Sequence, residues 1–290
     1  MARMVNETFR HRAIFISDVH LGTWGCQAEA LLDFLSRNEA ETIYLIGDIV
    51  DCWRLRQSWY WPKAHDDVVQ TLLARAKSGT RLVYVPGNHD EAFRKYFGTH
   101  LAGIEVTAQA VHETSDGRRF LVLHGDEFDG LVNYAKWLAH LGDHAYVALL
   151  MLNAMYNRLR RRLGFSYWSL SAYVKLRVKN ALRFIDDFER AVSEVARRKN
   201  VDGVICGHIH HAEIRRFGDV LYLNDGDWVE SCTAVVERPN GSLEIVRWAD
   251  GRRENRPAAA AAAPVPVPIS DDDGLTCPPL GVPSLKTRAG

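Results

Sequence analysis

Short runs of consecutive apolar residues recur through the first 125 residues of the chain and again after residue 203. They cover residues 13–16, 43–46, 82–85, 120–123 and 204–206. Such runs are typical of strands that are buried on both faces. Apolar residues at helical spacing over residues 27–38 and 65–77 predict helices between the first three strands. This strand–helix–strand order favours the α/β class with a largely parallel sheet.

The pattern changes between residues 131 and 200, where we find no good strand and predict several helices. We therefore expect a helical cap insertion, residues 131–200, within one domain of residues 1–250. After the insertion, strands over 220–223, 232–236 and 243–246 are separated by turn-rich segments, which predicts antiparallel pairing. Seven of the ten prolines lie beyond residue 250, so we expect residues 251–290 to be a disordered tail rich in proline and alanine.

The composition is that of an ordinary globular protein, with 47% apolar and 25% charged residues. The formal net charge of +0 gives no reason to expect nucleic acid as a partner of the whole molecule. The five cysteines are scattered and form no CxxC pair, which argues against a disulfide framework or a structural zinc site. Residues 1–12 lack the apolar segment of a secretory signal, so we expect a cytoplasmic protein.

Each of the five apolar runs is followed closely by side chains that bind metal ions. These side chains are Asp18, His20, Asp48, Asn88, His124, His208 and His210. In open α/β sheets, ligands bind beyond the carboxyl ends of the strands, where these side chains would meet. Imidazole and carboxylate ligands suit manganese, iron or zinc. Their number exceeds the needs of one four-coordinate ion and favours two divalent ions, an arrangement that serves phosphoryl transfer.

Five short segments around these residues resemble, in order and over about residues 13–250, the five motifs of the calcineurin-like metallophosphoesterases. The segments are Asp18-Val19-His20, Gly47-Asp48-Ile49-Val50-Asp51, Gly87-Asn88-His89-Asp90, His124-Gly125-Asp126 and Gly207-His208-Ile209-His210. The resemblance implies a sandwich of two mixed β-sheets flanked by helices. It also implies that a metal-activated hydroxide attacks the phosphorus atom of a phosphoester.

The resemblance assigns roles to single residues. One metal ion would be bound by Asp18, His20, Asp48 and His210, and the other by Asp48, Asn88, His124 and His208. Asp48 would bridge the two ions. His89 and Asp90 are expected to take part in catalysis. His89 would stabilise the transition state or protonate the leaving oxygen. Asp90, together with Asp51, would orient His89 and the ligand loop.

Within the superfamily, the helical insertion and residues 47–53 look most like the bacterial UDP-2,3-diacylglucosamine diphosphatases of lipid A synthesis. In those enzymes a helical cap holds acyl chains beside the metal site, so the resemblance implies a UDP-linked lipid as substrate. Lys175, Lys179 and Arg183 follow at i, i+4 and i+8 on one helical face of the insertion. That face could bind the diphosphate, or it could contact anionic headgroups at the inner membrane. An ordinary solvated basic face explains the spacing equally well.

One position departs from the best-known lipid A diphosphatases, which carry Arg where this chain has His89. A histidine suits a poorer leaving group, such as an alkoxide. A phosphomonoesterase or phosphodiesterase acting on another lipid, a nucleotide or nucleic acid is therefore an alternative. A non-catalytic scaffold with the same fold is a third interpretation. It is disfavoured because all seven ligand positions and His89 are present.

Overall fold

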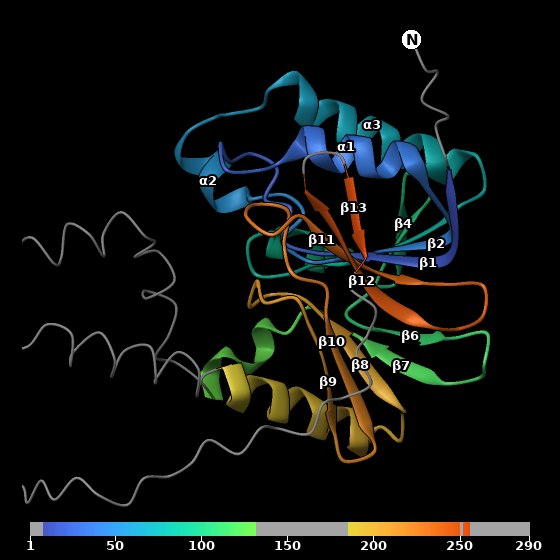
Figure 1. The fold of residues 1–290 in the computed structure, drawn as a ribbon. Coiled ribbons are helices and arrows are strands. Elements are labelled where there is room, and N and C mark those ends of the chain that lie inside the picture. The colour runs from blue at the N-terminus through green and yellow to red at the C-terminus, as the bar shows by residue number, and fades with distance from the viewer. Residues whose placement is uncertain (1–7, 132–184, 250–251, 256–290) are drawn as a thin grey trace, which may run out of the picture. The chain divides into compact units, whose positions relative to one another are not determined.

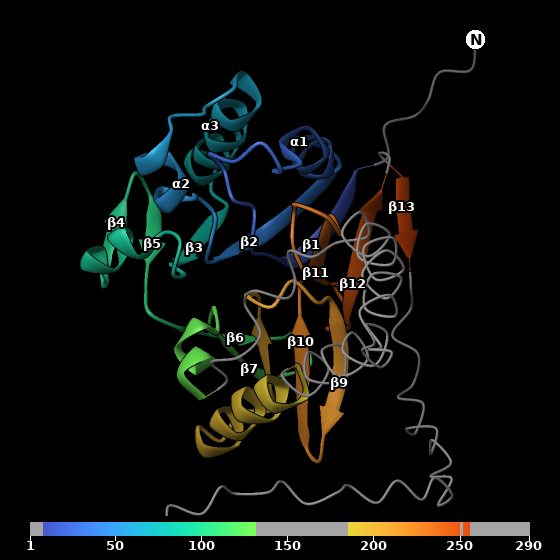
Figure 2. The same cartoon turned by 90° about the vertical axis from the view of Figure 1, so that its left-hand side faces the viewer.

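The computed structural model of the chain describes residues 8–131, 185–249 and 252–255. Within these residues two β-sheets lie face to face, and helices cover the outer face of each sheet (Figure 1). The same layers are seen after a turn of 90° (Figure 2). Among the described residues, no helix is both long enough and apolar enough to cross a bilayer.

The first sheet has eight strands in the order β13–β12–β11–β1–β2–β3–β5–β4. Its centre is parallel and its two edges are antiparallel. The strands are β1 (Phe9–Ile16), β2 (Asn38–Ile46), β3 (Arg81–Val85), β4 (Thr99–Leu101), β5 (Ile104–Val106), β11 (Thr233–Glu237), β12 (Leu243–Ala249) and β13 (Arg252–Asn255).

The second sheet has five strands in the order β6–β7–β8–β10–β9. Here β7, β8 and β10 run parallel, and β6 and β9 pair antiparallel at the edges. The strands are β6 (Ala110–Glu113), β7 (Arg119–Val122), β8 (Gly203–Cys206), β9 (Glu213–Phe217) and β10 (Val220–Asn224). The sandwich of two mixed sheets that the sequence predicts is confirmed.

Helices α1 (Ala28–Arg37) and α3 (Lys63–Lys77) cover the outer face of the first sheet, and the helical residues 185–198 cover that of the second. Successive residues of a strand point to opposite faces. Ile14 and Ile16 of β1 accordingly join the apolar cluster with α1, whereas Ala13 and Phe15 join the cluster between the sheets. Because both faces are covered, the strands need apolar residues at every position, which explains the unbroken runs in the sequence.

Shorter elements connect the layers. They are α2 (Cys52–Gln57) and the 3₁₀ turns η1 (Glu91–Tyr96) and η2 (Asp126–Leu131). The predicted antiparallel pairing is right for β11 with β12. Strand β10 also pairs antiparallel, but with β9 in the other sheet, and it runs parallel to β8. The residues after β10 carry the chain from one sheet to the other instead of forming a hairpin with β11.

The predicted cap and tail are only partly described. Residues 132–184, with Lys175, Lys179 and Arg183, lie outside the described residues. Residues 185–198 pack Phe188 and Val192 into the apolar cluster of the second sheet, so this part of the predicted insertion belongs to the core domain. In the structure, strand pairing extends into the first residues of the predicted tail. They pair with β12 as β13, because the backbone of an edge strand can pair whatever its side chains are.

Candidate metal centre

The loops that follow β1, β2, β3, β7 and β8 carry the predicted ligands, and backbone hydrogen bonds tie these loops together. The N–H of His20 donates to the carbonyl of Asp48 at 2.8 Å. The N–H of His89 donates to Oδ1 of Asp48, and that of His208 to Oδ2 of Asp18, both at 2.8 Å. Two of the predicted ligands are therefore oriented by main-chain donors from other loops.

Five of the predicted ligands have a positive φ, which is uncommon for residues other than glycine. They are Asp18 at 50°, His20 at 53°, Asp48 at 53°, His208 at 72° and His210 at 52°. Each such conformation costs about 1–3 kcal/mol and persists only where the surrounding structure enforces it. Their concentration at one place in the fold points to a functional site.

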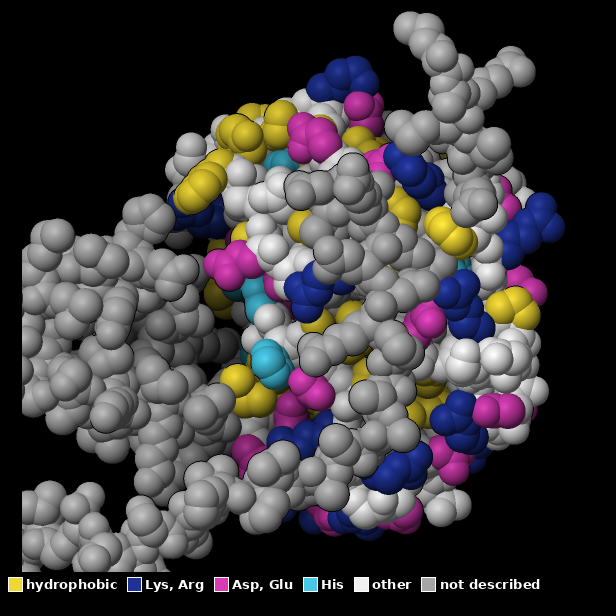
Figure 3. All heavy atoms as spheres, in the orientation of Figure 1, with side chains coloured by type: hydrophobic (Ala, Val, Ile, Leu, Met, Phe, Trp, Pro, Cys, Tyr) yellow, Lys and Arg dark blue, Asp and Glu magenta, His cyan; other side chains and the backbone are white. Residues whose placement is uncertain are grey.

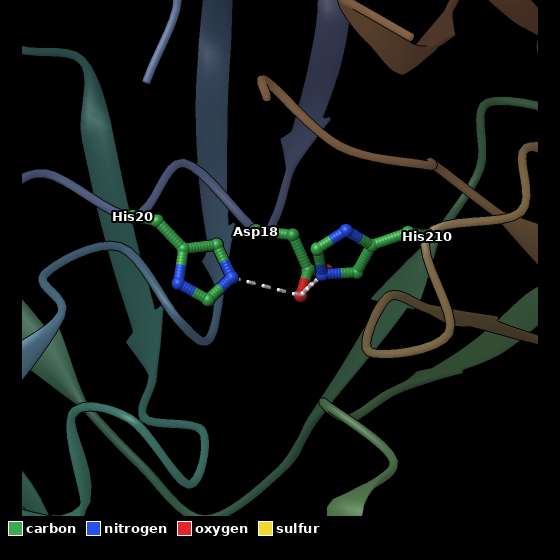
Figure 4. A group of neighbouring side chains, drawn as sticks. All are labelled: Asp18, His20 and His210. Atoms are coloured by element: carbon green, nitrogen blue, oxygen red, sulfur yellow. Dashed lines mark ion pairs between the residues drawn. The ribbon is translucent and has the colours of Figure 1, made fainter. Parts of the chain in front are cut away.

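The first ligand group consists of Asp18, His20 and His210 (Figure 4). The two imidazoles reach the Asp18 carboxylate from different loops, with Nε2 of His210 at 3.0 Å and Nε2 of His20 at 3.9 Å from Oδ1. One potential ligand atom from each residue lies within 4.8 Å of those of the other two. This spacing is close enough for one ion to contact all three side chains.

The second ligand group consists of Asp48, His124 and His208. Nε2 of His124 lies 3.5 Å from Oδ2 of Asp48. The other ring nitrogen, Nδ1, lies 2.9 Å from the carbonyl oxygen of Ile46, which leaves Nε2 to face the site. Gly87 lies against this group so closely that an added Cβ would be 2.3 Å from Oδ1 of Asp48.

The donor set can be tested against metal ions through atoms that the protein itself leaves without a partner. Nε2 of His20, Nε2 of His124 and Oδ1 of Asn88 are buried and make no hydrogen bond. Leaving such atoms unpaired is costly unless something else binds them. Imidazole nitrogens together with carboxylate and amide oxygens suit manganese, iron or zinc. The residues therefore fit divalent metal ions.

The carboxylates and imidazoles of the site lie so close together that they shift each other's pKa values. Burial alone would lower the pKa of His124, but Asp48 outweighs it and raises this pKa to about 10. Burial would likewise lower the pKa of His210, and Asp18 raises it to about 9. The pKa values of the two carboxyl groups, which burial alone would raise, are lowered by these imidazoles. The metal-free site thus contains ionised carboxylates whose charge is balanced by protons on histidine.

Asp51 links this centre to His89. Its Oδ2 lies 3.2 Å from Nδ1 of His20 and 3.0 Å from Nδ1 of His89, and its Oδ1 accepts the N–H of Arg54 at the start of α2. Burial would lower the pKa of His89, but the carboxylates of Asp51, Asp48 and Asp18 together outweigh this effect and raise it. The ring of Trp53 lies 4.3 Å from that of His89. The sequence analysis did not single out Trp53 as a site residue, although it lies only two residues beyond Asp51.

Asp90 and Asp51 were together expected to orient His89 and the ligand loop, and the structure gives each of them one of these contacts. The carboxylate of Asp90 is fully buried and accepts hydrogen bonds from the N–H groups of Ile49 and Gly87, at 2.8 and 2.6 Å. It also accepts the hydroxyl of Tyr84 at 2.5 Å. Asp90 therefore holds together the loops after β2 and β3 and is a positioning residue, whereas Asp51 contacts His89.

Ser17 and Asp225 form a further contact that the sequence analysis missed. The hydroxyl oxygen of Ser17 lies 2.6 Å from Oδ2 of Asp18 and 2.6 Å from Oδ1 of Asp225. Asp225 is fully buried, and this burial raises its pKa well above the ordinary value. The two residues are 208 positions apart, and no sequence pattern indicates their contact.

Comparison with known proteins identifies the family. The model of the calcineurin-like phosphoesterases matches residues 11–212, more than half of the chain. The chain belongs to the calcineurin-like phosphoesterase family. This family and the folded domain described above confirm the predicted fold class and support a phosphoester-hydrolysing enzyme that uses divalent metal ions.

Several relatives share the name UDP-2,3-diacylglucosamine hydrolase. The relative from Chromohalobacter salexigens is 26% identical over 208 residues, covering 70% of this chain and 82% of that protein. The one from Ralstonia nicotianae is 26% identical over 262 residues, covering 85% and 92%. Among solved structures, the Escherichia coli phosphoesterase Yfce is similar with a TM-score of 0.42 and 15% identity, covering 83% of this chain and 95% of that one.

Proposed function

We propose that this phosphoesterase binds two divalent metal ions, manganese in the first instance, and cleaves the diphosphate of UDP-2,3-diacylglucosamine. One observation carries the two-ion proposal: Oδ2 of Asp48 lies 3.5 Å from Nε2 of His124 and 3.9 Å from Nε2 of His20. A carboxylate between the two ligand groups is suited to bridge two ions, and two such ions would stabilise the attacking and leaving oxygens of an in-line displacement at phosphorus. The substrate is suggested by the names of the relatives.

In this proposal the first ligand group and Asp48 hold one ion, and the second group with Asn88 holds the other. The ions, when bound, supply an activated water and neutralise charge on the phosphate oxygens. His89 lies beside them, with Nε2 at 4.0 Å from Oδ2 of Asp48 and Nδ1 beside Asp51. This orientation allows His89 to donate a hydrogen bond from Nε2 to a phosphate oxygen or a proton to the leaving oxygen.

The Asp51–His89 contact favours a second candidate, hydrolysis of a phosphomonoester or phosphodiester with an alkoxide leaving group. Such a leaving group needs a proton donor, and a carboxylate that raises the pKa of His89 favours the protonated imidazole. The phosphate monoester that would leave from a UDP-linked lipid is less basic and depends less on this proton. The importance of His89 for the rate therefore distinguishes the two candidates.

The test compares three substrates with the manganese-loaded full chain: UDP-2,3-diacylglucosamine, a water-soluble phosphodiester and a phosphomonoester. We expect the UDP-lipid to be preferred, with activity lost in Asp48→Ala and only reduced in His89→Ala. Asp219→Ala, which removes a carboxylate with 83% of its side chain exposed, is the matched control. Preference for an alkyl ester, together with near-complete loss in His89→Ala, would instead support the second candidate.

A further inference from the structure

Three large aromatic side chains outside the metal centre point into solvent. Trp24, Trp59 and Tyr60 are 82%, 76% and 44% exposed, and we call these three residues the aromatic rim. Single exposed apolar residues are common on protein surfaces. Two highly exposed tryptophans and a tyrosine in neighbouring loops are uncommon. A concentration of this kind marks an interaction surface.

The two loops that carry the aromatic rim meet at His65, the third residue of α3. The N–H of Gly22, two residues before Trp24, donates to Nδ1 of His65 at 3.0 Å. From the other loop, the rings of Tyr60 and Trp61 pack edge-on against the same imidazole, with centroids 5.7 and 5.6 Å away. The β1–α1 and α2–α3 connections, which carry the rim, are thus adjacent at His65.

Positive charge accompanies the aromatic rim. Residues 52–62 include Arg54 and Arg56 but no aspartate or glutamate, and both arginines are exposed. Figure 3 shows hydrophobic side chains gathered at the edge of the molecule where the chain passes from α2 to α3, with both Lys or Arg and Asp or Glu side chains beside them. Trp59 stacks on Trp61 with ring centroids 6.1 Å apart, so its exposed ring has a fixed support.

We propose that the aromatic rim, with Arg54 and Arg56, binds the surface of an anionic phospholipid bilayer. Tryptophan and tyrosine favour the boundary between lipid and water because an apolar ring carries one polar group. Arginine adds attraction to anionic headgroups. This occupant matches both the exposed aromatic area and the sign of the charge. The binding does not depend on the identity of the substrate.

The aromatic rim lies near the metal centre, so membrane binding there would bring the centre close to lipid. Trp53, on α2 between Asp51 and Arg54, contacts His89 at the metal centre, so the arginines of the proposed surface lie on the same short helix as a residue of the site. A protein seated on the bilayer by α2 and the rim would hold its metal centre close to the headgroups. A lipid-linked substrate could then be hydrolysed at the membrane surface.

The test is flotation of the full metal-loaded chain with vesicles. We expect binding to vesicles of equal parts phosphatidylcholine and phosphatidylglycerol, and much less to phosphatidylcholine alone. The double variant Trp24→Ala/Trp59→Ala should bind at least about tenfold more weakly, because two large rings lose apolar contact with lipid. Arg54→Gln/Arg56→Gln should lose the preference for the anionic vesicles. Phe97→Ala, which removes an aromatic ring 41% exposed and outside the rim, is the control and should bind as the parent does.

Hydrolysis of a water-soluble phosphodiester by the Trp24→Ala/Trp59→Ala variant should equal that of the parent, because neither side chain is placed in the metal centre. This measurement separates a failed membrane proposal from a failed functional one. The proposal is overturned if the full chain does not float with anionic vesicles. It is overturned equally if the double variant binds them as the parent does, since another part of the chain would then make the contact.

Discussion

Oδ2 of Asp51 lies 3.0 Å from Nδ1 of His89. The same oxygen lies 3.2 Å from Nδ1 of His20, so one carboxylate faces both a ligand of the first group and the proposed hydrogen-bond donor. Because Nδ1 of each ring is turned toward Asp51, Nε2 of each ring is left for the metal centre. Partners of this kind fix the ring orientation and tautomer of ligating histidines.

Asp51→Asn should weaken metal binding and shift the pH dependence of hydrolysis. Loss of such an outer partner typically costs about 10- to 100-fold in affinity or activity. Asp51 raises the pKa of His89, so its neutralisation lowers this pKa. The alkaline limb of the kcat/KM profile should then move to lower pH, because His89 loses its proton earlier. Manganese titration and a pH–rate profile measure the two effects.

Asp116→Asn provides the matched control, since Asp116 also accepts local hydrogen bonds but lies in the β6–β7 turn. It should change neither metal affinity nor the pH–rate profile. An unchanged alkaline limb in Asp51→Asn, with its activity reduced, would show that His89 does not act as the proton donor.

Asp48→Ala should remove metal from both ligand groups, because Asp48 lies between them. We expect the metal content of the purified protein to fall from about two ions per chain toward zero and the rate to fall by more than about 100-fold. His210→Ala, which removes a ligand from the first group alone, should retain one ion. Elemental analysis distinguishes these results, and one ion retained by Asp48→Ala would contradict the bridging role.

Metal binding should release protons and strengthen as the pH rises. Without metal, the pKa values of His124 and His210 are raised to about 10 and about 9, so both rings are protonated at neutral pH. A metal ion must displace these protons before it can bind the same nitrogens. Calorimetry in buffers of different ionisation enthalpy measures the released protons. Absence of proton release at pH 7 would contradict the protonation of these rings.

The stability of the metal-free protein should depend on pH with a definite sign. A histidine whose pKa is raised in the folded state contributes stability below its unfolded pKa of about 6.5. That contribution is lost as the pH rises through the folded values of about 9 and 10. The melting temperature of the metal-free chain should therefore fall between pH 7 and pH 10. Added manganese should reduce the fall, since the ion replaces the lost positive charge.

Tyr84→Phe should destabilise the fold without changing the pH–rate profile. The Tyr84 hydroxyl donates to the buried carboxylate of Asp90, which holds the backbone after β2 and β3. Removing a donor to a buried acceptor costs about 1–3 kcal/mol in the free energy of unfolding. Chemical denaturation of the metal-loaded protein measures this loss. A shifted pH–rate profile in Tyr84→Phe would instead indicate that Asp90 acts on His89, as the sequence suggested.

The sequence was sufficient to predict the layers and the meeting of the candidate metal ligands at one edge of the sheets, because both depend on local patterns. Unbroken apolar runs identify strands covered on both faces, and Asp18, Asp48 and His124 follow such runs within two residues. The sequence could not predict which strands pair with each other, because pairing depends on the neighbouring strand as well as on the strand's own residues. The backbone of β13 pairs with β12 despite the polar sequence of Arg252–Asn255, and nothing in residues 220–223 indicates that β10 joins the second sheet.

Contacts between distant side chains were only partly predicted. The resemblance gave Asp90 and Asp51 one shared role, orienting His89 and the ligand loop, whereas in the structure Asp51 faces the imidazole and Asp90 accepts backbone N–H groups. Neighbours in sequence at a sharp turn commonly point in different directions. Trp53 was missed for a related reason, because an aromatic residue on a short polar helix has no pattern that distinguishes a site residue from a surface one.

The five ligand residues with positive φ have a consequence for engineering this protein. Glycine would relieve the backbone at any of these positions, so His208→Gly would remove an unfavourable conformation together with a proposed metal ligand. Asp18→Gly would also remove the buried carboxylate that accepts the N–H of His208 and faces His210. Libraries intended to stabilise the protein should be screened for retained metal as well as for heat resistance, because a substitution that relieves the backbone here removes a proposed ligand.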